Sequence, residues 1–78
     1  MNRGQIEAIV LAVLASVLQC EVDIDCSRHN TPRWDSLKHV EIVFTLEDEL
    51  NVEFTEEQMA TLDSAQKIIE MALTQHAT

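Results

Sequence analysis

A serine beside an aspartate opens the helical pattern in the middle of the chain. Residues 33–44 read RWDSLKHVEIVF, and Ser36 stands where the apolar periodicity begins. A nucleophilic serine needs a positioned base, and in many hydrolases a glycine-containing turn exposes it. The local sequence offers neither a glycine elbow nor a histidine arranged as such a base. We therefore expect that any chemistry at Ser36 is performed on it by another protein, and that this chain is not an enzyme.

Apolar residues at helical spacing predict four helices. The first is expected over roughly residues 3–19, the second over about 36–50, and the third, shorter helix begins at the capping box Thr55–Gln58 and ends near Thr61. The fourth is capped by Asp63 or Ser64. Its apolar stripe consists of Ala65, Ile68, Ile69, Ala72 and Leu73.

The connection between the first two helices is long. Residues 20–35 lack helical periodicity and contain Asn30, Thr31 and Pro32, so we expect an ordered loop. A length of 78 residues allows one small domain, and a single glycine and a single proline argue against an all-β fold. The prediction is one all-α domain, residues 1–78, folded as a four-helix bundle with a short third helix.

The charge of the chain is strongly negative, with a net charge of −9 and a pI near 4.4. Such a field repels nucleic acid, attracts basic patches on other proteins, and also helps to keep a small domain monomeric. The apolar stretch Ile6–Leu18 contains Glu7 and is shorter than the roughly 20 residues that span a bilayer. With no signal-peptide pattern and no disulfide framework, we expect a monomeric, cytoplasmic protein that does not insert into membranes.

The second predicted helix has apolar residues on two sides. At about 100° per residue, one arc holds four of them and the opposite arc holds three, mixed with carboxylates. The first set is Ile42, Val43, Leu46 and Leu50; the second is Leu37, Val40 and Phe44, among Glu41, Glu47 and Asp48. One stripe suffices to fold a small domain, so the second set indicates a docking surface. The alternative is that the long loop or the third helix covers it.

Ser36 lies at the amino end of this helix, at the edge of the second arc. Free N–H groups and the positive end of the helix dipole favour a phosphate attached there. The alternative is that Ser36 simply caps the helix. Asp35 is an equally good cap, and it would leave the serine hydroxyl free.

Asp35-Ser36-Leu37, followed by the acidic and apolar helix from Val40 to Leu50, resembles the acyl carrier protein family. The similarity covers nearly the whole chain and is strongest from Trp34 to Ile69. The resemblance implies that Ser36 carries a 4′-phosphopantetheine arm, which a phosphopantetheinyl transferase attaches from coenzyme A. Acyl groups would then travel as thioesters on the terminal thiol of the arm.

The resemblance also implies which residues meet the partner enzymes of fatty-acid, polyketide or other acyl pathways. These acyl-loading and acyl-using enzymes would present basic docking patches. The matched positions are the acidic Asp35, Glu41, Glu47 and Asp48 and the apolar Leu37, Val40 and Phe44.

Several positions depart from the common family pattern. Arg33-Trp34 stands where a glycine-containing segment is usual, Lys38 stands where an acid is frequent, and Arg28 and His29 make the loop locally basic. Trp34-Asp35-Ser36-Leu37 looks more like the specialised, stand-alone carriers of accessory pathways than the carrier of general fatty-acid synthesis. An aminoacyl or peptidyl carrier of a nonribosomal pathway, and an acidic interaction domain that never takes an arm, remain alternatives.

Two metal sites can be considered and rejected. Cys20, Cys26, His29 and His39 do not have the spacing of a structural zinc site. The loop from Asp23 to Trp34 lacks the glycine and the final glutamate of a calcium-binding EF-hand. We expect His39 to be partly buried on the core side. Trp34 is expected to pack the loop onto the bundle, or alternatively to shield the arm.

Overall fold

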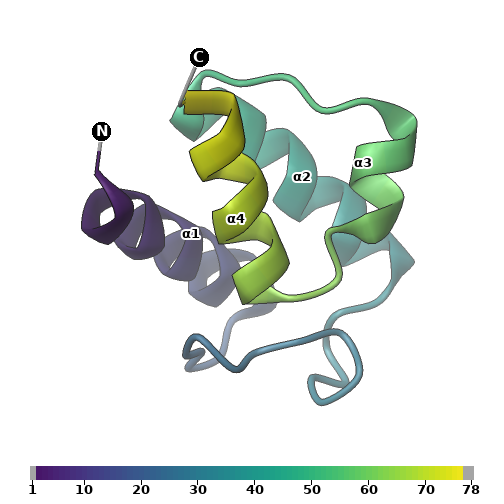
Figure 1. Ribbon diagram of the computed structural model, residues 1–78. Helices are drawn as coiled ribbons and strands as arrows, with labels where there is room; N and C mark the ends of the chain where they lie inside the picture. The colour runs from purple at the N-terminus through teal and green to yellow at the C-terminus, as the bar shows by residue number, and fades with distance from the viewer. Residues whose placement is uncertain (1, 77–78) are drawn as a thin grey trace.

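The computed structural model describes residues 2–76 and contains the four predicted helices (Figure 1). They are α1 (Arg3–Leu18), α2 (Ser36–Leu50), α3 (Glu56–Thr61) and α4 (Ala65–His76). The all-α class, the short third helix and the long first loop are confirmed. Helix α1 packs against both α2 and α4. The loop between α1 and α2 runs along one end of the bundle, at the bottom of Figure 1.

Local capping determines where the helices begin and end. Asn2 and Gln5 form a reciprocal capping box at the start of α1, and Thr55 and Gln58 form the predicted one at the start of α3. The Ser64 Oγ accepts the N–H of Lys67 at 3.2 Å, so Ser64 rather than Asp63 caps α4. Helix α1 ends one residue before its predicted end because Gln19 adopts a left-handed conformation.

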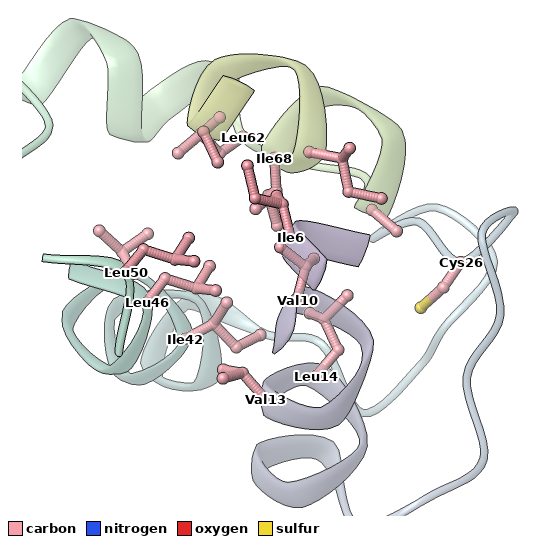
Figure 2. Close-up of a cluster of buried hydrophobic side chains, with 14 of the residues drawn as sticks. Ile6, Val10, Val13, Leu14, Cys26, Ile42, Leu46, Leu50, Leu62 and Ile68 are labelled. Carbon is pink, nitrogen blue, oxygen red and sulfur yellow. The ribbon is translucent and has the colours of Figure 1, made fainter. Parts of the chain in front are cut away.

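The core lies between α1, α2 and α4. In Figure 2 the side chains of Val10 and Leu14 on α1, Ile42 and Leu46 on α2 and Ile68 on α4 gather in one buried cluster. All five side chains are fully buried. Burying an aliphatic side chain of this size contributes about 1.5–3 kcal/mol, so this shared core is the main source of stability.

The first loop is attached to the far end of the bundle. The N–H of Arg28 donates to the carbonyl of Asp63 at 2.9 Å, and the N–H of Ala65 donates to the carbonyl of Cys26 at 2.9 Å. This pair of bonds forms a small antiparallel bridge between Ser27 and Ser64. The loop is therefore held beside the connection between α3 and α4. This agrees with the prediction of an ordered loop.

Candidate functional site

Ser36 begins α2 with an exposed side chain that takes no part in capping. The Oδ1 of Asp35 accepts the backbone N–H of Lys38 at 2.9 Å, and the carbonyl of Asp35 accepts the N–H of His39 at 2.8 Å. Asp35 is therefore the N-cap. Of the two caps that the sequence allowed, the structure uses the one that leaves the serine hydroxyl available.

An arginine side chain donates a hydrogen bond to the Ser36 hydroxyl. The Nη2 of Arg28 donates to the Ser36 Oγ at 3.1 Å. Within residues 2–76, no protein acceptor meets the backbone N–H groups of Ser36 and Leu37, which open the helix. Unpaired N–H groups at a helix start, together with a guanidinium, form an environment that favours an anion on this side chain.

Trp34 anchors the chain immediately before the serine. Its side chain is only 2% exposed, and its ring stacks on that of His39 with 6.1 Å between centroids. The Trp34 Nε1–H donates to His39 Nδ1 at 3.1 Å, and His39 Nε2 donates to the carbonyl of Met59 at 2.7 Å. Both contacts require the neutral imidazole with its proton on Nε2. Trp34 thus packs the loop onto the bundle, and the expectation of a partly buried His39 is confirmed.

One side of α2 leaves large apolar side chains in solvent. Leu37 is 82% exposed, Val40 50% and Phe44 58%, whereas Ile42, Val43, Leu46 and Leu50 are buried. We call the surface formed by Leu37, Val40 and Phe44 the outer face. Neither the long loop nor α3 covers it, so the alternative that it belongs to the core does not hold.

Carboxylates border the outer face, but they are not equivalent. Glu41 and Asp48 are exposed, and Glu41 forms an ion pair with Lys38 at 3.7 Å. Glu47 is half-buried, and its Oε2 accepts the N–H of Phe54 at 2.9 Å. Glu47 therefore also anchors the segment that leads to α3, a structural role that helical spacing alone could not reveal.

Phe44 also borders a surface depression at the carboxyl end of α2. Its other lining residues include Glu47, Asp48, Val52 and Phe54. The depression combines aromatic side chains with three carboxylates, those of Glu47, Asp48 and Glu53, beside the outer face. It extends the exposed apolar and acidic surface toward the end of the helix.

Cysteines and histidines of the loop do not converge. Cys26 is buried and lies 3.3 Å from the Thr31 hydroxyl, while Cys20 is half-buried, and both thiols are free. No group of three or more histidine, cysteine or acidic side chains in the described part of the chain is arranged to hold a metal ion.

Asp63 lies in the connection between α3 and α4, and its pKa is perturbed. The ammonium group of Lys67 lies 3.0 Å from one carboxylate oxygen, and the ring of His29 lies 3.9 Å from the other. The hydrogen bond from Lys67 is the main cause that lowers the pKa of Asp63 below its usual value. Its backbone carbonyl also accepts the N–H of Arg28, so Asp63 links α4 to the loop that carries Arg28.

Arg28 is the residue that sequence reasoning did not single out. The only signal was the locally basic stretch that it forms with His29 and Arg33. Loop residues follow no periodicity, so the letters do not show which side chain reaches Ser36.

A search with protein-family models finds no match for this chain, and a search among curated proteins finds none either. Within residues 2–76, no helix combines the length and the apolar character that a bilayer crossing requires.

Proposed function

We propose that this chain is a carrier protein that holds acyl groups as thioesters on a 4′-phosphopantetheine arm attached to Ser36. The observation that carries the proposal is the exposed Ser36 hydroxyl, which Asp35 relieves of capping and which lies beside the exposed outer face. The resemblance to acyl carrier proteins, from Asp35-Ser36-Leu37 onward, supports the same assignment. Fatty-acid, polyketide and other acyl pathways use carriers of this kind.

Attachment of the arm would follow from the chemistry of coenzyme A. The Ser36 Oγ bonds to the phosphorus next to pantetheine, and the bond from that phosphorus to the oxygen bridging the two phosphates breaks. Adenosine 3′,5′-bisphosphate leaves with the electron pair, and the hydroxyl proton passes to a base supplied by the transferase. The carrier contributes the nucleophilic oxygen and the surface on which the transferase docks, so it needs no catalytic group of its own.

The outer face would be the docking surface for the transferase and for the acyl-loading and acyl-using enzymes. Its apolar side chains supply the contact area that a partner can bury. The exposed carboxylates of Glu41 and Asp48 favour partners with basic patches, in keeping with the net charge of −9. Asp35 and Glu47 belong to the same border, although both also hold backbone groups within this protein.

The proposal is tested by intact mass spectrometry after incubation with coenzyme A, magnesium and a broad-specificity phosphopantetheinyl transferase. We expect a gain of one phosphopantetheine, which peptide mapping places on Ser36. The Ser36→Ala variant should fold normally and gain nothing. Ser16→Ala, which removes an exposed serine from α1, is the matched control and should load like the unmodified sequence.

A second candidate function uses the same surface without an arm. The exposure of Leu37, Val40 and Phe44 would equally suit an acidic helical domain that binds a basic partner directly. If the folded protein gained no mass with several transferases, this interaction domain would replace the carrier. If it did gain the arm, loading assays with acyl, aminoacyl and peptidyl donors would separate an acyl carrier from a nonribosomal one.

A further inference from the structure

The five basic side chains of this acidic protein are not equally engaged. Three form ion pairs with carboxylates, and Arg33 donates to backbone carbonyls at the end of α1. The ion pairs are Arg3–Glu7 at 3.4 Å, Lys38–Glu41 at 3.7 Å and Lys67–Asp63 at 3.0 Å; Arg33 contacts the oxygens of Leu18 and Gln19. Among residues 2–76, Arg28 pairs with no carboxylate, and its guanidinium donates only to the Ser36 hydroxyl. Of the five, Arg28 is therefore the basic side chain whose contact is directed at Ser36.

The backbone holds Arg28 in place for this contact. Its N–H donates to the carbonyl of Asp63 at 2.9 Å, and Cys26, two residues earlier, is buried. The side chain of Asn30 braces the same turn, because its Oδ1 accepts the N–H of Ser27 and its Nδ2 donates to the carbonyl of Asp25. The guanidinium therefore extends from an anchored backbone, which reduces the entropy lost when it binds an anion.

We propose that the Arg28 guanidinium binds the phosphate that joins the arm to Ser36, and so fixes the root of the arm at the amino end of α2. This inference rests on the proposed function, since that function assigns the attachment to Ser36. The Nη2 of Arg28 lies 3.1 Å from the oxygen that would be bonded to phosphorus, and the free phosphate oxygens would be two bonds from that oxygen. The planar fork of arginine matches phosphate oxygens better than a lysine ammonium does.

Electrostatic repulsion between Asp35 and an added phosphate defines the role that we propose for Arg28. The carboxylate of Asp35 adjoins Ser36 and repels an added phosphate, although it must stay in place to cap α2. The Arg28 charge offsets this repulsion, together with the unpaired N–H groups of Ser36 and Leu37. Arg28 is thus a positioning residue, and it takes no part in forming or breaking the bond to phosphorus.

The test compares three forms of the chain: unmodified, carrying phosphoserine at position 36 by chemical ligation, and loaded with phosphopantetheine. The readouts are the NMR resonances of the Arg28 guanidinium N–H groups and the unfolding equilibrium. In both modified forms we expect the Arg28 resonances to shift and their exchange with water to slow. Phosphorylation should favour the folded state about three- to tenfold more with Arg28 than in Arg28→Gln, and high salt should shrink that difference.

Two further variants define the contact. Arg28→Lys should keep part of the effect, because it retains the charge without the fork. Arg3→Gln removes the same charge from α1 and should leave the effect of the phosphate unchanged.

The inference is overturned if the Arg28 resonances stay in place in the phosphoserine form, or if Arg28→Gln responds to phosphorylation like the original sequence. If the transferase fails to load the chain but phosphoserine moves the Arg28 resonances, the proposed function fails while the phosphate contact stands.

Discussion

The two sides of α2 have similar apolar content and opposite environments. The inner side places Ile42, Val43, Leu46 and Leu50 in the core shared with α1 and α4, whereas the outer face leaves Leu37, Val40 and Phe44 in solvent among carboxylates. The same helix therefore does two separate things. Its inner side stabilises the fold by burying apolar surface. Its outer face stays exposed because no other element of the described bundle packs on it.

The largest effect should come from the inner side. Leu46→Ala removes a fully buried side chain and should lower the free energy of unfolding by about 3 kcal/mol, because it leaves a cavity as well as losing apolar burial. Urea titration followed by circular dichroism measures this loss. A cost below about 1 kcal/mol would mean that the interior is loosely packed and that the contrast between the two sides is false.

Phe44→Ala should have the opposite profile. Since the side chain is 58% exposed, the free energy of unfolding should change by less than about 0.5 kcal/mol. The rate of phosphopantetheine transfer should fall about tenfold if the aromatic ring is a docking anchor. Initial rates at limiting carrier concentration give this number, and Glu41→Lys should act in the same direction. Parallel losses of stability and loading would show that the outer face belongs to the core.

Asp35 and Ser36 allow a second comparison, between two adjacent residues at the amino end of α2. Asp35→Ala removes the cap and should cost about 1 kcal/mol of stability, whereas Ser36→Ala should change stability by less than about 0.5 kcal/mol. Thermal unfolding of the two variants side by side provides the measurement. If Ser36→Ala were the more destabilising variant, the hydroxyl would have a structural role that its exposed position does not indicate.

The smallest expected effect is the contribution of the Asp63–Lys67 ion pair to the free energy of unfolding. The pKa of Asp63 is lowered in the folded protein by Lys67, so its ionised form adds stability that is fully present above the unfolded value of about 3.8 and is lost as the pH falls through the folded pKa. For a partly exposed pair this amounts to roughly 0.5 kcal/mol or less. Comparing Lys67→Met with the original sequence at pH 7 and pH 3 should show a larger difference in stability at the higher pH, because protonation of Asp63 removes the ion pair. A difference of equal size at both pH values would assign the effect to packing.

Much of the fold follows from local sequence. The capping box at Thr55 and Gln58 and the apolar spacing of the other helices involve residues only three or four positions apart, so they can be identified from the letters. The four helices and the assignment of Ile42, Val43, Leu46 and Leu50 to the core were predicted for this reason. The end of α1 and the choice of Ser64 over Asp63 as a cap depend on backbone geometry, which composition does not specify.

The candidate site divides in the same way. The sequence by itself determined that Ser36 begins a helix with apolar residues on two sides, because both features are periodic. Only the tertiary structure decided that the outer face stays uncovered, that Trp34 is buried against His39, and that Arg28 reaches the serine hydroxyl. For Arg28 the physical reason is that its backbone is held by the bridge between the first loop and the start of α4, which joins segments far apart in the chain.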